Sequence, residues 1–277
     1  MNNIKVYTGN CLEFQFDVIK AKNESDLKNF AISISEEITN HSNHYCDSFD
    51  NNTLNTLIES NTSIENFRDL YSYSAKNFVL LKNHLTTGAE SRIIKCQYCT
   101  LNDVNSFDHI APKKMYGAYA IHPKNLFPAC TECNSYKTSN YLENGICKYI
   151  NLYKDQLQNS EYLFVNIDLG YQDSSMEINY FLNNRDNICP TLFRKIENHY
   201  NDLHLFSRFS KNSYTEVNLF KDSIIQYLRH GISLEKSIEI IKANINSESE
   251  IFGINYWKCV LKRNLISNDD FLIDCKI

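Results

Sequence analysis

Helical spacing of apolar residues marks the first part of the chain. Ser25 and Asp26 can cap a helix, and the apolar residues after them recur every three or four positions. These positions are Leu27, Phe30, Ile34 and Ile38. The polar segment 40–52 predicts a loop, and the apolar groups at 54–58 and 67–71 predict two further short helical segments.

The pattern changes in the middle of the chain. Residues 86–140 lack helical periodicity and contain several prolines and four close-set cysteines. Beyond this stretch, apolar and polar residues alternate over 163–169 and 176–180, with the turn-forming segment GYQDSS between them. This alternation predicts a β-hairpin.

Helical spacing returns in the last third of the chain. Ser213 and Glu216 have the spacing of a capping box, so a helix is expected to begin there and to end at Gly231. Ser233 is expected to begin the next helix, whose apolar residues again follow helical spacing.

We therefore expect an α+β fold in three regions. A helical N-terminal region covers 1–85, a core covers 86–150, and a β-hairpin with helices covers 151–277. The chain has 277 residues, more than one domain of usual size, and 43% of them are hydrophobic, enough for a sizeable core. No repeat or flexible linker separates the regions, so the outer parts are expected to pack around the middle.

The sequence predicts a cytoplasmic protein without a membrane span. It has no run of 18 apolar residues, and its N-terminus lacks a basic stretch followed by an apolar one. The ten cysteines are then expected to face a reducing environment and to stay thiols unless a metal holds them.

Charge is unevenly distributed. The net charge is −5, which argues against a general coat for nucleic acid. Residues 85–150, however, carry seven basic and five acidic side chains, a balance of +2, and the remainder carries 21 basic and 28 acidic, a balance of −7. A local basic patch of this kind can bind a phosphate backbone weakly and with strong salt dependence.

Two Cys-x-x-Cys pairs predict a structural zinc site. Cys96 and Cys99 form one pair, and Cys130 and Cys133 form the other, 30 residues further along the chain. Each turn can direct two sulfurs at one point, and two turns complete a tetrahedral shell. The alternative, a redox motif, needs only one pair, in a βαβ setting that the sequence does not show.

The other six cysteines are expected to be buried thiols; they are Cys11, Cys46, Cys147, Cys189, Cys259 and Cys275. His41-x-x-His44-x-Cys46 has residues that can bind a metal. We instead expect this segment to lie at a helix end, where basic side chains suit the helix dipole.

Between the two cysteine pairs lie residues suited to phosphodiester hydrolysis. That reaction needs a base to activate water, a group that neutralises the charge on the scissile phosphate and a group that stabilises the departing oxygen. Asp108 and His109 are neighbours, so at a bent strand end one can bind a hard cation and the other can face water. Asn134 is expected in the first turn of a helix, with Lys137 one turn further on the same side.

These segments carry a family resemblance. In chain order, CQYC, FDHIAPK, NLFPACTECN and a lysine resemble the HNH endonuclease motif with its zinc knuckle. The resemblance covers 96–137. This segment is similar to that of stand-alone bacterial HNH proteins, many of which are associated with restriction or phage defence. It implies a ββα-metal core, in which a hairpin and a helix hold one catalytic cation.

The resemblance also implies roles for four residues. His109 matches the general base, Asp108 a metal ligand on the first strand, and Asn125 the residue that orients the base through the backbone or braces the hairpin. Asn134 matches the last motif position, where many members have His. An amide oxygen suits Mg²⁺ or Mn²⁺ and is a poorer ligand for softer ions.

Other side chains in this stretch have two interpretations each. Lys137 and Lys113 are expected to contact substrate phosphates, although solvated surface charges are the alternative. His122 is interpreted as a surface histidine, with a substrate-contacting or supporting role as the alternative. Tyr98 is expected to pack over the zinc knuckle.

The expected function is metal-dependent endonuclease activity in anti-phage defence or restriction, with structural Zn²⁺ and catalytic Mg²⁺ or Mn²⁺. Nucleic acid is the expected partner, and DNA is favoured over RNA. Because the net charge predicts weak affinity for DNA, a protein partner such as a defence-system ATPase or sensor is also expected. The alternatives are an RNA-cleaving HNH toxin or effector and a non-catalytic zinc-ribbon module that binds nucleic acid.

Overall fold

The chain folds into two compact units. The computed structural model describes residues 1–60, 65–87, 94–137, 139, 141–157, 160–170 and 176–276. The N-terminal unit is Asn3–Gln156, and the C-terminal unit is Leu157–Ile277 together with Met1 and Asn2. Helices and short antiparallel strands occur in both units, which confirms the α+β class. Within the described part of the chain, no helix has the length and apolar character needed to span a membrane.

The N-terminal unit begins with short helices. Their bounds are α1 Cys11–Lys20, α2 Asp26–Ser33, α3 Ser35–Asp50, η1 Leu54–Thr56, η2 Glu65–Leu70 and α4 Lys76–Thr86, where η is a 3-10 helix. Asn10 caps α1, since its side chain accepts hydrogen bonds from the amides of Leu12 and Glu13. Ser25 caps α2 as predicted, through the amide of Lys28.

One helix and one loop were predicted wrongly in this region. The helix that starts after Ser25 ends at Ser33 instead of passing Ile38, and α3 then begins at Ser35. The segment 40–52 is not a loop, because α3 runs through most of it. Its buried positions explain why: Ile38, Ser42, Tyr45, Ser48 and Phe49 fall at helical spacing on one face.

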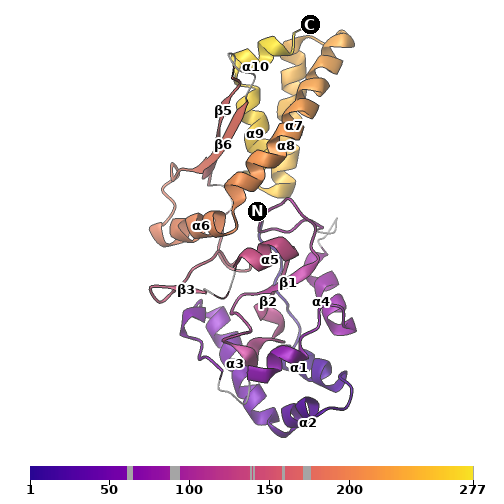
Figure 1. Ribbon diagram of the computed structural model, residues 1–277, viewed down its shortest axis with the longest axis vertical. Coiled ribbons are helices and arrows are strands. Elements are labelled where there is room, and N and C mark those ends of the chain that lie inside the picture. The colour runs from indigo at the N-terminus through magenta and orange to yellow at the C-terminus, as the bar shows by residue number, and fades with distance from the viewer. Residues whose placement is uncertain are drawn as a thin grey trace. The chain divides into compact units, whose positions relative to one another are not determined.

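The middle of the N-terminal unit is a hairpin followed by a helix. Strand β1 (Ser106–His109) pairs antiparallel with β2 (Leu126–Ala129), and α5 (Thr131–Lys137) follows directly. Figure 1 shows the two strands side by side with α5 next to them. The connection between the strands contains η3 (Gly117–Tyr119) and η4 (Pro123–Asn125). A small second hairpin, β3 (Leu142–Glu143) and β4 (Ile146–Cys147), turns through Asn144 and Gly145, both at positive φ.

Aromatic side chains join the hairpin to the rest of this unit. Tyr98 stacks on Phe127 of β2 with ring centroids 4.5 Å apart, and Tyr153 meets the same ring edge-on at 5.2 Å. Phe107 of β1 is fully buried, as is Phe78 of α4. The strands are therefore held inside a packed core, which fixes the side chains at their ends.

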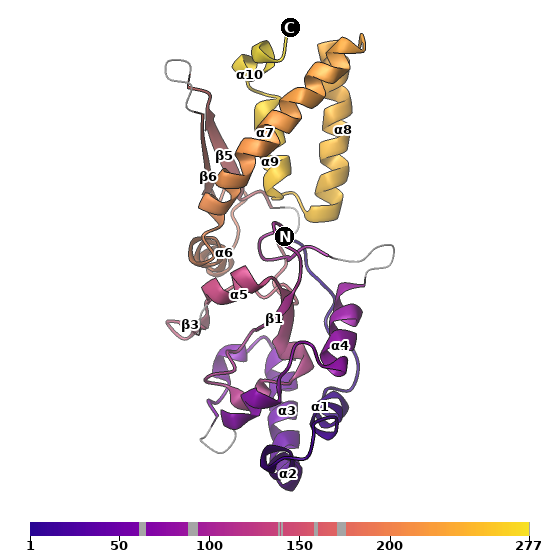
Figure 2. The same ribbon diagram turned by 45° about the vertical axis from the view of Figure 1, so that its right-hand side comes forward.

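The C-terminal unit confirms the predicted hairpin. Strands β5 (Leu163–Asp168) and β6 (Glu177–Leu182) pair antiparallel, with Leu163 opposite Leu182. Of the predicted turn GYQDSS, residues 171–175 lie outside the described part of the chain. Figure 2 shows the two strands against the long helices of this unit.

Five helices complete the C-terminal unit: α6 Pro190–Asp202, α7 Leu205–Arg229, α8 Leu234–Phe252, α9 Trp257–Leu265 and α10 Asp269–Asp274. Ser233 caps α8 as predicted, and Gly231 follows the end of α7 at positive φ. The capping box at Ser213 was predicted wrongly, since α7 begins eight residues earlier, at Leu205. Inside the helix, the Ser213 hydroxyl is buried and bonds to the Phe209 carbonyl (2.9 Å) and the Tyr180 hydroxyl (2.9 Å).

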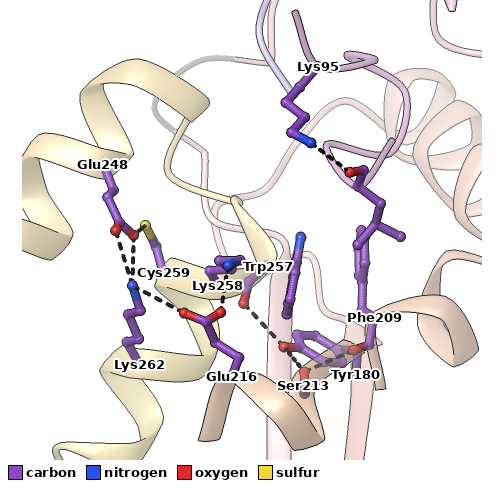
Figure 3. Close-up of polar contacts among 11 residues, drawn as sticks. Lys95, Tyr180, Phe209, Ser213, Glu216, Glu248, Trp257, Lys258, Cys259 and Lys262 are labelled. Atoms are coloured by element: carbon purple, nitrogen blue, oxygen red, sulfur yellow. Dashed lines mark hydrogen bonds and ion pairs between the residues drawn. The ribbon is translucent and has the colours of Figure 1, made fainter. Parts of the chain in front are cut away.

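Charged side chains connect three helices of this unit (Figure 3). The ammonium of Lys262 on α9 lies 3.0 Å from Glu248 on α8 and 3.5 Å from Glu216 on α7. Lys258 pairs with the same Glu216 at 2.5 Å. Because Glu216 makes these contacts, its side chain serves helix packing instead of the capping box that the sequence predicts.

Candidate functional site

Four thiols converge beside the β1–β2 hairpin. The sulfurs of Cys96, Cys99, Cys130 and Cys133 all lie within 4.8 Å of one another, and all four residues are buried. The first pair sits on a tight turn that Thr100 closes at positive φ, with its amide donating to the Cys96 carbonyl at 2.7 Å. Four sulfurs around a tetrahedral zinc would lie about 3.8 Å apart. The Cys99 and Cys130 sulfurs are 3.9 Å apart, so this cluster fits a zinc ion.

The remaining cysteines only partly follow the prediction of buried thiols. Cys11, Cys259 and Cys275 are buried, whereas Cys46 and Cys147 are half-buried. Cys189 was predicted wrongly: it is exposed, because it lies at the open N-terminus of α6. His41, His44 and Cys46 were expected at a helix end, and that is also wrong, since all three lie inside α3. The rings of His41 and Tyr119 form a T-shaped contact.

Asp108 belongs to a buried ion pair. Its Oδ2 atom accepts hydrogen bonds from the Tyr98 hydroxyl (2.9 Å) and from the Lys137 ammonium (2.5 Å). Lys137 also donates to the His109 carbonyl at 3.2 Å and is only 4% exposed. Burial, and then the Asp108 carboxylate, raises the pKa of the Tyr98 phenol well above its usual value. Lys137 thus lies against Asp108 and not at the surface where a phosphate contact would be made.

His109 ends strand β1 as a neutral, fixed imidazole. Its Nε2 atom lies 3.0 Å from the carbonyl oxygen of Ala120. A carbonyl can only accept, so Nε2 carries the hydrogen and Nδ1 is the basic nitrogen. Burial lowers the pKa of His109 to about 3, with smaller contributions from Lys113 and Lys137. Near neutral pH the ring is therefore uncharged, and Nδ1 is the nitrogen that carries the lone pair.

Asn125 fastens the connection between the two strands. Its side-chain oxygen accepts from the Ala111 amide (2.8 Å) and the Tyr45 hydroxyl (2.9 Å). Its side-chain nitrogen donates to the carbonyls of Ala111 (3.1 Å) and Tyr119 (3.0 Å). The residue after Tyr119 provides the carbonyl that holds His109. Asn125 is fully buried and fixes the backbone next to the carbonyl that His109 contacts.

Asn134 completes the group from α5. Its side-chain nitrogen donates to the Phe107 carbonyl at 3.0 Å, which fixes the amide and leaves its oxygen for another ligand. Asn134, Asp108, His109 and Lys113 all line one cleft of about 430 Å³. The structure therefore brings four predicted site residues to one surface, while the buried side chains of Asn125 and Lys137 support them from behind.

Two tyrosines of this cleft were not predicted from the sequence. Tyr71 meets the His109 ring edge-on at 4.8 Å, and the Lys113 ammonium lies 4.8 Å from the centre of the Tyr71 ring. Tyr73 also lines the cleft and packs against Phe107. Both follow η2, more than twenty residues before the motif, and the alternating Tyr-Ser-Tyr pattern there is the only local signal.

Two further expectations in this stretch have opposite outcomes. His122 was interpreted as a surface histidine, and this is wrong: it is fully buried, with its ring 4.4 Å from that of Tyr45. Tyr98 packs inside the first cysteine turn and stacks on Phe127, as expected.

Comparison with known proteins identifies the central segment. Residues 96–140 match the family model "HNH endonuclease". The chain is also similar to Protein ea31 of Escherichia phage lambda, with 24% identity over 197 residues. That alignment covers 64% of this chain and 63% of the phage protein, so the chain spans less than two thirds of this relative. No solved structure matches the chain.

Proposed function

Residues 96–140 form an HNH endonuclease domain, and from this premise we propose that the protein is a metal-dependent endonuclease that hydrolyses phosphodiester bonds in DNA. One observation carries the proposal. A neutral buried imidazole, a carboxylate and a fixed amide, from His109, Asp108 and Asn134, line the same cleft. Metal-dependent hydrolysis of a phosphodiester needs a base and a set of hard oxygen ligands placed in this way.

We assign the general base to Nδ1 of His109. The Ala120 carbonyl holds the opposite ring nitrogen, so the imidazole cannot rotate away when Nδ1 takes a proton from water. Tyr71 packs against one edge of the ring and limits its motion further. Attack of that water on phosphorus would release the 3′ oxygen and leave 5′-phosphate and 3′-hydroxyl ends.

We assign the cation ligands to Asp108 and Asn134. Both hydrogen bonds to the Asp108 carboxylate use Oδ2, so Oδ1 is the oxygen offered to the cation, together with the amide oxygen of Asn134. When bound, Mg²⁺ or Mn²⁺ supplies positive charge to the scissile phosphate and to the departing oxygen. Lys137 and Tyr98 hold the carboxylate in place for this role.

Zinc in the four-cysteine cluster is proposed to be structural. Cys130 and Cys133 bracket the start of α5, and Cys96 and Cys99 lie on the turn ahead of β1. A metal bound to all four sulfurs would join α5 to the hairpin and so keep Asn134 beside Asp108. Zinc sites of this kind contribute about 10 kcal/mol or more to folding in isolated peptides.

Substrate phosphates are proposed to meet the lysines at the rim of the cleft. Lys113 is half-buried against Tyr71, and Lys114 is exposed beside it. Burial lowers the pKa of Lys113 from its usual value, and a phosphate close to the ammonium would oppose that shift. The sequence predicts that Lys137 contacts a phosphate. Its buried position instead favours a role in holding Asp108 in place.

We place this activity in the cytoplasm, in restriction or anti-phage defence, because the motif resembles stand-alone bacterial proteins with such roles. The net charge of −5 predicts weak affinity for DNA by itself and favours delivery by a protein partner such as an ATPase or sensor.

The test is cleavage of supercoiled plasmid, single-stranded DNA and RNA with Mg²⁺, Mn²⁺ or chelator. The parent chain should cut DNA only with a cation, and His109→Ala should not. His230→Ala, an exposed histidine after α7, is the matched control and should cut like the parent. Cleavage of RNA alone would support the RNA-directed alternative, and nucleic-acid binding without any cleavage would support the non-catalytic zinc-ribbon module.

A further inference from the structure

A second group of metal-binding side chains lies apart from the four-cysteine cluster. Cys11, Cys46 and His122 have ligand atoms that all lie within 4.8 Å of one another. Cys11 and His122 are buried, and Cys46 is half-buried. None of these residues belongs to the HNH motif positions, and the three are separated by 34 and 75 intervening residues in the sequence.

Three different elements of the N-terminal unit bring these side chains together. Cys11 is the first residue of α1, Cys46 lies in the last two turns of α3, and His122 is the residue before η4. Helix α1 packs against both α3 and η4, so the three ligand positions are fixed by helix packing and not by a flexible loop alone. A hydrogen bond of 2.6 Å from Gln15 to Ser42 further joins α1 to α3.

The spacing of these atoms matches a tetrahedral metal. With Zn–S near 2.3 Å and Zn–N near 2.0–2.1 Å, a sulfur and a nitrogen on the same zinc lie about 3.6 Å apart. The Cys46 sulfur and Nε2 of His122 are 3.5 Å apart. The Cys11 sulfur lies within 4.8 Å of both of these atoms and is the third ligand. A hydrogen-bonded thiol and imidazole also give such a distance, so the third ligand is what distinguishes this cluster.

We propose that Cys11, Cys46 and His122 form a second zinc site, with water or another small ligand in the fourth position. Two thiolates and one imidazole are soft and borderline ligands, which select Zn²⁺ and reject Mg²⁺ and Mn²⁺. Among the described residues, three protein ligands meet at this cluster, and partial exposure of Cys46 leaves a route to solvent. Three ligands and an open position are a known arrangement for zinc.

This zinc would connect the N-terminal helices to the catalytic part of the domain. The His122 ring packs on Tyr45, and the Tyr45 hydroxyl donates to the side-chain oxygen of Asn125 at 2.9 Å. Asn125 in turn fixes the backbone beside His109. Binding at the second site would therefore hold α1 and α3 against the segment that positions the proposed base.

The test is zinc content of the full chain, purified without chelator under reducing conditions and measured by native mass spectrometry and elemental analysis. We expect two zinc ions per chain in the parent. Cys46→Ser should carry one, and Cys130→Ser should also lose one, because the variants affect different sites. Cys275→Ser, a buried thiol in the C-terminal unit, is the matched control and should keep both. None of these readouts depends on nuclease activity.

A second measurement covers the case in which Cys46→Ser does not fold. In the parent chain, alkylation and peptide mapping should find Cys11 and Cys46 protected until a chelator removes zinc. The proposal is overturned if the parent holds a single zinc that Cys130→Ser abolishes and Cys46→Ser retains. It is equally overturned if Cys11 and Cys46 react freely in the zinc-loaded chain, or if they are joined to each other by a disulfide.

Discussion

The ammonium of Lys137 lies 2.5 Å from the Oδ2 atom of Asp108, and both side chains are almost completely buried. The two residues are 29 positions apart, one on β1 and one at the end of α5. Removing one partner from such a pair leaves an unpaired charge in the protein interior. The pair therefore joins the hairpin to helix α5 and fixes the position of the proposed metal ligand.

Lys137→Met should destabilise the protein by about 3–5 kcal/mol, because it leaves the Asp108 carboxylate buried without its partner. The double variant Lys137→Met/Asp108→Asn should recover much of this loss. Urea unfolding of the two single variants and the double variant measures the coupling. Lys236→Met, which removes an exposed ion pair with Glu239, should change stability little. Strictly additive effects at Lys137 and Asp108 would contradict the buried pair.

Substitutions of His109 and Asp108 should have different effects on metal binding and cleavage. His109→Ala should bind Mn²⁺ nearly as the parent does, yet lose about 10²–10⁴-fold in cleavage rate, because only the base is removed. Asp108→Ala and Asn134→Ala should weaken Mn²⁺ binding, and extra Mn²⁺ should restore part of their activity. Calorimetric titration beside single-turnover cleavage separates the two outcomes. If His109→Ala loses Mn²⁺ binding while Asp108→Ala keeps it, the roles of base and metal ligand are reversed.

Asn125→Ala should lower stability as well as activity. The change leaves the Ala111 amide, the Tyr45 hydroxyl and two carbonyls without their buried partner. Each buried group left unsatisfied costs about 1–3 kcal/mol. Asn246→Ala, at an exposed position on α8, should stay within about 0.5 kcal/mol of the parent in the same unfolding experiment. Equal stability of the two variants would show that Asn125 does not brace the connection.

Cys130→Ser should release the zinc of the four-cysteine cluster and destabilise the nuclease domain, since the metal joins α5 to the hairpin. Cys147→Ser should do neither, because its half-buried thiol lies outside the cluster. Circular dichroism with elemental analysis of both variants checks this. Retained zinc in Cys130→Ser, at the level of the parent and with native helicity, would contradict the assignment of the cluster.

Local sequence signals were enough to predict some elements. Ser25 and Ser233 cap helices as expected, because a cap depends on the next three residues alone. The HNH residues could be found because their order and spacing are contiguous in the chain. Helix α3 was missed because most of its residues are polar, and its apolar face becomes visible only when Tyr45 and Phe49 meet the rest of the core.

Contacts between distant segments could not be predicted in this way. Nothing in the sequence near Lys137 shows that its ammonium pairs with Asp108 instead of reaching the surface. Tyr71 joins the site from a segment that carries no motif. The Cys11, Cys46 and His122 cluster depends on helix packing, which no spacing rule along the chain describes.

The side chain of Asn125 separates the loop 112–118 from the rest of the connection between the strands. Its bonds to Ala111 and Tyr119 bracket residues 112–118, and Ser60 also holds this loop through the Met115 carbonyl and the Ala118 amide. Lys113 and Lys114 lie on that loop, whereas His109 lies outside it. Substitution of Lys113 or Lys114 is therefore expected to change the charge of the loop while the proposed base keeps its position. Asn125 would in this way let the proposed phosphate contacts change without moving the proposed base.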